Sequence, residues 1–181
     1  KYVALMLAAA LAFGTIATSC TSEEETQQGV LTSREVDFSN IGLKYTTPES
    51  WMEYTKSNNI YPYAYEEDYT IANIRYNYIT PDDWDMLSNA EDGVVVNDYL
   101  YPICEIVVIE TEQASKLKSS GLYTTFSSRD LIKENNGVSY YLFYDYVGSI
   151  RNMGEENVAI YDEICSGINE LAGSFMVTDF D

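Results

Sequence analysis

Carboxylates are the most abundant side chains in this chain that could act in catalysis or bind a metal. The chain contains 29 Asp and Glu residues and no histidine. Without histidine the chain lacks the usual general base, a common metal ligand and the ordinary Ser-His-Asp arrangement. Two carboxylates could still hydrolyse a glycosidic bond, but no spacing in the sequence singles out one pair. We therefore expect a non-catalytic domain, with a carboxylate-based hydrolase as the alternative.

One acidic cluster has the ligand chemistry that calcium prefers. Asp82, Asp83 and Asp85 lie close together in a segment predicted to be a loop or short helix. Calcium binds carboxylate and carbonyl oxygens on loops, but the twelve-residue spacing with its Gly and terminal Glu is missing here. A solvated acidic loop is the alternative interpretation, and no other cofactor is expected.

Two cysteines inside the predicted domain allow a disulfide or two core thiols. Cys104 falls in an apolar strand and Cys165 on the apolar stripe of a helix. Disulfides persist in exported proteins, whereas free cysteine is among the most buried residue types. Both interpretations remain open, and neither position suits an exposed nucleophilic thiolate.

Tyrosines recur at alternate positions in two predicted strands. Such side chains share one face of a strand, because the side-chain period of a strand is two. If the row is exposed, its rigid amphipathic rings make a contact platform for sugar, peptide or protein. If it faces other elements, it is cross-strand packing or core. The residues are Tyr61, Tyr63 and Tyr65 in one strand, and Tyr144 and Tyr146 in the other.

The first 19 residues have the order of a secretory signal, with a basic residue, an apolar run over residues 2–16 and a small-residue segment. Cys20 follows directly, and Ser19-Cys20 resembles the lipobox of bacterial lipoproteins, although Ala17 stands where many lipoboxes have Leu. The resemblance implies cleavage before Cys20 and lipid on its sulfur, usually with acylation of the new N-terminus. Several acyl chains are needed for a firm anchor. A retained transmembrane helix is the alternative.

An acidic, polar segment follows the cysteine and indicates a flexible tether over residues 20–34. Its start resembles the surface-export signal of Bacteroidetes lipoproteins, on Ser22, Glu23, Glu24 and Glu25. This resemblance implies a cell-envelope protein on the outer-membrane surface. A solvated spacer, with a periplasmic or Gram-positive membrane location, is the alternative.

The net charge of −19 excludes some partners. A strongly acidic surface repels nucleic-acid phosphates and anionic lipid, so we expect neither as a ligand, and contact with the membrane only through the lipid anchor. A protein or glycan partner in the envelope remains. We therefore expect a non-catalytic binding or assembly domain, with a carbohydrate-binding or carbohydrate-active surface lipoprotein as the alternative. A surface lipoprotein without a specific ligand is a further alternative.

The remaining elements predict a single α+β domain over residues 35–181. Alternating residues predict strands at 60–65 and 69–79, and a run apolar on both faces predicts a covered central strand at 103–109. A short helix is expected at 111–119. Asn136-Gly137 predicts a hairpin turn between strands at 122–133 and 138–146. Apolar three- and four-residue steps predict a long amphipathic helix at 155–172.

The order of these elements resembles the PsbP-like α/β/α sandwich. The resemblance rests on a hairpin that leads to Pro48 and Trp51, an antiparallel sheet, and a closing aromatic strand, long helix and short strand. It implies an antiparallel sheet of about six strands covered by helices. Because the members of that family act mostly in assembly and binding, it also implies an interaction module without a shared catalytic set.

Overall fold

The computed structural model describes residues 34–65, 67–89, 99–145 and 152–179. The helices and strands in these residues confirm the predicted α+β class. Within these residues the larger sheet has the order β3-β4-β5-β7-β6 (Ile60–Tyr65, Ala72–Tyr78, Tyr101–Glu110, Val138–Tyr144 and Ser128–Asn135), and the smaller sheet has the order β1-β2-β8 (Glu35–Phe38, Leu43–Thr46 and Met176–Val177). The helical segments are η1 (Ser39–Ile41), η2 (Glu49–Trp51), α2 (Met52–Lys56), α3 (Pro81–Ser88), η4 (Thr111–Ser119), α4 (Leu122–Thr125), α5 (Glu155–Ser166) and α6 (Ile168–Gly173).

The prediction of one sheet of about six strands is wrong, because the strands divide into an antiparallel five-stranded and an antiparallel three-stranded sheet. The hairpin β1-β2 pairs with β8 instead of joining β3, with Leu43 opposite Val177. Gly42 permits this pairing: its φ is +65°, and a Cβ at this position would lie 2.4 Å from the Thr178 carbonyl oxygen. Alternation along a strand indicates its buried face, but it does not identify the neighbouring strand.

The strand predictions are confirmed at most positions. β3 spans the predicted residues, and β5 lies in the middle of the sheet between β4 and β7. Asn136 and Gly137 have φ values of 48° and 80°, as a two-residue hairpin turn requires. The predicted strand at 122–133 begins too early, because residues 122–125 form helix α4 and β6 begins at Ser128.

The predicted long C-terminal helix is present as α5 and α6, which meet at Gly167. Its buried stripe includes Tyr161, Ile164 and Leu171. A Cβ on Gly167 would lie 2.8 Å from Pro48 Cβ, so only glycine allows this close approach. Trp51 also lies close to Gly167, and its Nε1 donates to the Ile164 carbonyl oxygen at 2.6 Å. The Pro-x-x-Trp segment thereby fixes the helix over the sheet.

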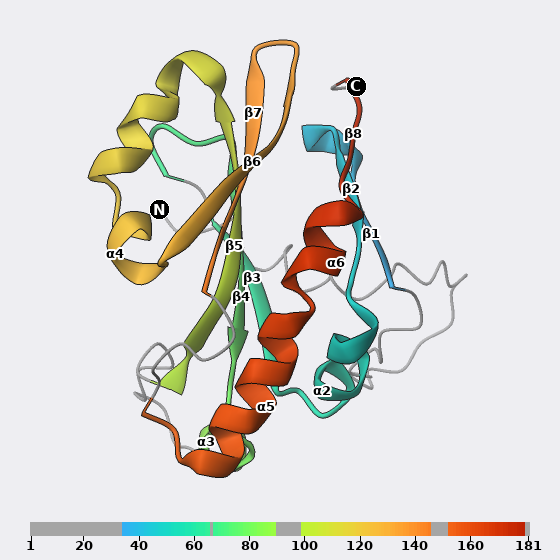
Figure 1. Ribbon diagram of the computed structural model, residues 1–181, viewed down its shortest axis with the longest axis vertical. Coiled ribbons are helices and arrows are strands. Elements are labelled where there is room, and N and C mark those ends of the chain that lie inside the picture. Colours follow the sequence, from blue (N-terminus) through green and yellow to red (C-terminus); the bar gives the residue numbers. More distant parts are fainter. Residues whose placement is uncertain (1–33, 66, 90–98, 146–151, 180–181) are drawn as a thin grey trace, which may run out of the picture.

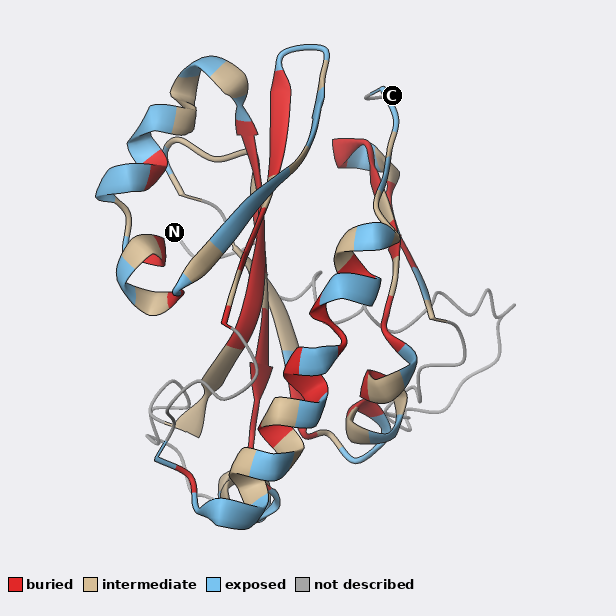
Figure 2. Ribbon diagram, in the orientation of Figure 1, coloured by how far each residue is buried: buried red, intermediate tan, exposed pale blue. Residues whose placement is uncertain are grey.

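The larger sheet has two faces of different character (Figures 1 and 2). We call the one under the C-terminal helices the α5 face; its buried side chains include Tyr76, Cys104 and Tyr140. We call the other the η4 face. There η4 and α4 cover β5 and β7 around a second core cluster, composed of Val107, Ile109, Leu117, Leu122, Phe126 and Phe143.

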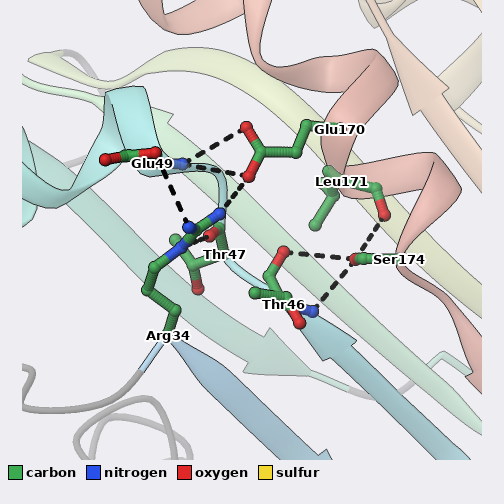
Figure 3. A network of polar contacts seen from close by, with 7 residues as sticks. All are labelled: Arg34, Thr46, Thr47, Glu49, Glu170, Leu171 and Ser174. Atoms are coloured by element: carbon green, nitrogen blue, oxygen red, sulfur yellow. Dashed lines mark hydrogen bonds and ion pairs between the residues drawn. The ribbon is translucent and has the colours of Figure 1, made fainter.

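Arg34, the first described residue, fastens the start of the domain to its last helix (Figure 3). Its Nε donates to the Thr47 carbonyl oxygen at 2.8 Å, and its guanidinium forms an ion pair with Glu170 of α6. Nearby, Ser174 Oγ accepts a hydrogen bond from the Thr46 N–H at 3.0 Å. The last residue of the predicted tether therefore makes domain contacts.

Candidate functional site

A row of three tyrosines runs along β3 on the η4 face. Tyr61, Tyr63 and Tyr65 alternate, so their rings stand on the same side of the strand. The ring centroids are 6.3 Å apart for Tyr61 and Tyr63, and 5.6 Å apart for Tyr63 and Tyr65. Tyr61 is 39 % exposed, and the other two are half-buried. We call these residues the tyrosine row.

A buried ion pair lies beside the tyrosine row. The strand registers place Tyr63 opposite Arg75 of β4, and Arg75 opposite Glu105 of β5. The Glu105 side chain is fully buried, whereas the Arg75 side chain is 21 % exposed. Arg75 Nε donates to Glu105 Oε2 in an ion pair. Two neighbouring strands thus give the η4 face one buried anion and its cation.

Glu105 also holds the last ring of the row. The Tyr65 hydroxyl donates to Glu105 Oε1 at 2.5 Å, and Asn73 Nδ2 donates to the same oxygen at 2.8 Å. Arg75 Nη2 in turn donates to the Tyr65 hydroxyl at 3.1 Å. Both carboxylate oxygens therefore accept hydrogen bonds, as burial of a charge requires. This arrangement fixes the ring and the guanidinium relative to each other.

The guanidinium of Arg75 lies between two aromatic rings. Its central carbon is 5.6 Å from the Tyr65 ring centroid and 5.9 Å from that of Phe126. Such cation–π contacts favour a cation over a ring face. The cation also occupies the space that another positive group would need beside Tyr65.

Burial and charge shift the ionisation of these groups in different directions. Burial, and after it the charge of Glu105, raises the pKa of Tyr65. Burial also raises the pKa of Tyr63, although the nearby Arg75 opposes that effect. For Arg75 burial is the largest single effect and lowers the pKa, but Glu105, Tyr65 and Tyr63 together outweigh it and raise the pKa. At neutral pH Tyr63 and Tyr65 are therefore uncharged beside the ion pair.

These contacts hold Tyr65 and Arg75 in fixed positions on the η4 face. A buried ion pair is weak evidence for stability, because desolvation offsets much of the attraction between its charges. Here the pair positions Tyr65 and Arg75, and a contact surface needs such support from the residues behind it. Because both oxygens of Glu105 are already hydrogen-bonded, its carboxylate is arranged as an anchor for neighbouring side chains.

The sequence analysis missed Glu105, because the strand at 103–109 was interpreted as apolar on both faces. A signal was present: a charged residue inside a covered strand requires a partner, since Glu is almost never fully buried unpaired. Arg75 on the polar side of the strand at 69–79 was the available cation. Recognising that partnership would have required the β4–β5 register, which the sequence does not give.

The second tyrosine pair is not part of this site. Tyr144 pairs with Cys104 in the β5–β7 register and packs against the core cluster of the α5 face. Its hydroxyl donates to Asp130 Oδ2 at 2.9 Å. Tyr146 lies outside the described residues. The structure therefore brings Tyr61, Tyr63 and Tyr65 together and places Tyr144 on the opposite face.

The three aspartates of the calcium prediction lie in the helix α3. Asp83 takes part in capping the N-terminus of α3 together with Thr80. The Thr80 hydroxyl donates to Asp83 Oδ2 at 2.7 Å and accepts from the Asp83 N–H at 3.1 Å. Asp82 and Asp85 are exposed. Nowhere in the described part of the chain do three or more Asp, Glu, Cys or His side chains gather as metal ligands. The arrangement lends the calcium prediction no support.

The two cysteines are both buried thiols on the α5 side of the sheet, Cys104 on β5 and Cys165 on α5. Burial raises the pKa of Cys104 well above its ordinary value, and Cys165 adds to this shift. Their positions agree with core packing, and the disulfide stays a prediction. A thiol with a raised pKa is a poor nucleophile at neutral pH.

The anchor residues predicted from the sequence lie outside the described residues. These are Cys20, Ser22, Glu23, Glu24 and Glu25, together with the signal and most of the tether. Among the described helices, none combines the length and the apolar character needed to cross a bilayer.

Comparison with known proteins gives no relative for this chain. We found no match among protein-family models, none among curated proteins and none among solved structures.

Proposed function

We propose that this chain is a lipid-anchored lipoprotein of the cell envelope whose domain is a non-catalytic binding module. The tyrosine row carries the proposal for the domain. It combines an exposed ring at Tyr61 with the Tyr65 ring, whose hydroxyl is held by Arg75 and Glu105. Rigid aromatic side chains contribute much of the energy at binding surfaces, and they lose little conformational freedom when they bind.

The proposed anchor is supported by the sequence around Cys20. Small residues precede this cysteine, an apolar run precedes them, and an acidic segment follows. Arg34, the first described residue, contacts the domain, and we propose the segment between Cys20 and Arg34 as the connection between lipid and domain. The acidic residues after Cys20 support display on the outer-membrane surface.

We also propose that the fold of the domain is a PsbP-like sandwich. Its support is the antiparallel sheet covered by a closing helix, with Pro48 and Trp51 packed against that helix. An interaction module, as this resemblance implies, agrees with a site built from contact residues.

Fractionation of cells that express the full chain tests the anchor. Lipid-labelled wild type should sediment with membranes, whereas Cys20→Ala should lose the label and the membrane association. Cys165→Ala is a matched control that should keep both. Protease added to intact cells should remove the domain if it faces outward. Equal labelling of wild type and Cys20→Ala would overturn the proposed anchor.

Pull-down with the unlipidated full chain, made soluble by Cys20→Ser, tests the binding surface. Envelope material retained by this protein should be lost with Tyr61→Ala, because that change removes the most exposed ring of the row. Leu131→Ala is a matched control, since Leu131 is 49 % exposed on β6, the strand at the opposite end of the sheet from β3. Equal retention by all three proteins would refute a binding role for the tyrosine row.

A further inference from the structure

We propose that the ligand of the tyrosine row is an uncharged glycan, whose sugar rings stack on Tyr61 and Tyr63 while their hydroxyls meet Arg75. This inference rests on the proposed binding function. A sugar ring presents apolar C–H faces and a polar rim. The site matches both, because the exposed ring of Tyr61 and the half-buried ring of Tyr63 lie near Arg75, whose side chain carries hydrogen-bond donors and remains 21 % exposed.

The charges of the site favour a neutral ligand over an anion. Arg75 is the only cation in the Tyr63–Arg75–Glu105 row of neighbouring side chains, and Glu105 neutralises it. The chain as a whole has a net charge of −19. An anionic ligand would approach against this field without a free positive charge to receive it.

A cation is disfavoured at the same place by a local effect. Tyrosine faces can bind ammonium groups, and the acidic surface would attract them. However, Arg75 already lies over the Tyr65 ring at 5.6 Å, and its charge repels a second cation there. Its Nη2 also donates to the Tyr65 hydroxyl. The contact of a positive group with the Tyr65 ring is therefore already made from within the protein.

An extended peptide added to the edge of β3 is also disfavoured. The Ile79 N–H donates to the Asn59 carbonyl oxygen. In an antiparallel pair every second residue faces its partner strand in this way, so residues 61, 63 and 65 direct their N–H and C=O groups toward β4. Residues 61, 63 and 65 are the three tyrosines. The backbone groups that point away from the sheet at this edge therefore belong to residues 60, 62 and 64. Pro62, in the middle of that outward set, has no N–H to donate. A proline on an edge strand interrupts pairing with an additional strand.

Affinity electrophoresis of the unlipidated full chain tests this inference. The native gels contain one uncharged polysaccharide each: an α-glucan, a β-glucan, a xylan or a mannan. At least one should retard the wild type. Tyr61→Ala should weaken that binding by about tenfold or more, a change of about 1.4 kcal/mol. Tyr61→Phe keeps the ring and should retain most of the retardation, and Leu131→Ala should match the wild type.

The outcomes separate the ligand class from the binding function. If no neutral polysaccharide retards the wild type while Tyr61→Ala still loses envelope material, the glycan inference fails and the binding function stands. If a polysaccharide retards wild type and Tyr61→Ala equally, the glycan does not contact the row and the inference fails. If Tyr61→Ala changes neither assay, both proposals fail. Circular dichroism of each variant checks that it has folded.

Discussion

Tyrosines have different roles on the two faces of the same sheet. On the α5 face Tyr76 is buried and hydrogen-bonds to Tyr45 of the smaller sheet, and the Tyr140 hydroxyl donates to the Ile41 carbonyl oxygen at 2.9 Å. On the η4 face Tyr65 donates to a carboxylate, and Tyr61 reaches the surface. The first group fills a core, and the second forms a row beside an ion pair.

The difference shows that the neighbours of a tyrosine decide its role. On the α5 face, helices α5 and α6 and the hairpin β1-β2 cover the rings, and nearby oxygen atoms pair with their hydroxyls. On the η4 face, η4 and α4 pack over β5 and β7, while the tyrosine row lies on edge strand β3. Burial of apolar area stabilises the first group, whereas contact with a ligand is the proposed use of the second.

Trp51→Ala should give the largest loss of stability, because it removes a fully buried side chain that fixes the C-terminal helix on the α5 face. Truncation of a buried Trp costs about 3–5 kcal/mol. Trp84→Ala is the matched control, since Trp84 is only partly buried on α3. Urea unfolding monitored by circular dichroism measures both. Equal losses would show that Trp51 does not anchor the helix.

Glu105→Ala should cost about 3 kcal/mol, because it leaves Arg75 with no carboxylate in a partly buried site. We place the cost at this lower value because Arg75 is 21 % exposed and water can reach it. Glu110→Ala, at an exposed position of the same strand, should change stability by less than about 0.5 kcal/mol.

The double variant Glu105→Leu with Arg75→Met separates pairing from packing. Replacing both charges with apolar side chains should recover much of the stability lost in Glu105→Ala. It should nevertheless impair binding at the tyrosine row, because Tyr65 loses its partners. Urea unfolding and the pull-down assay measure the two effects. A double variant with full binding would show that the ion pair does not position the row.

Alkaline pH should destabilise the fold through tyrosines of the α5 face. Burial is the main cause that raises the pKa of Tyr78 from 10.0 to about 12. The unfolded chain ionises first, so between pH 10 and 12 the folded state binds more protons and stability falls as pH rises. Below pH 10 this contribution is fully present.

Urea midpoints measured across this pH range, with tyrosinate absorbance recorded alongside, test the assignment. Tyr78→Phe should flatten the alkaline fall in the midpoint, because it removes one of the titrating groups. Leu131→Ala, which removes no titrating group, serves as the comparison and should leave the slope near that of the wild type. A Tyr78→Phe slope equal to the wild-type slope would contradict the role of Tyr78.

Tyr61→Ala should have the smallest effect on stability, within about 0.5 kcal/mol, because an exposed side chain away from special features contributes little. Its effect should appear in binding. The same two measurements, urea unfolding and pull-down, therefore distinguish the faces. A loss of several kcal/mol would place Tyr61 among the core residues and remove the contrast between the two faces.

Local patterns predicted the elements well where the signal lay within one segment. Asn136-Gly137 specified its turn through the positive φ values that both residues adopt. The apolar stripe specified the C-terminal helix, including Tyr161 and Leu171. Errors arose where the outcome depends on a distant partner. β8 pairs with β2 through a contact at Gly42. Glu105 is accommodated in the core because Arg75, Tyr65 and Asn73 pair with its carboxylate.

The amino-acid sequence by itself determined the α+β class, most of the elements and the face of β3 that carries the tyrosine row, because periodicity within a segment sets which side chains share a face. Only the tertiary structure decided the division into two sheets and the environment of that row. Register and neighbouring strands set these features. The same contacts decide that Tyr61 is exposed, that Tyr144 lies on the opposite face, and that Glu105 is buried beside Arg75.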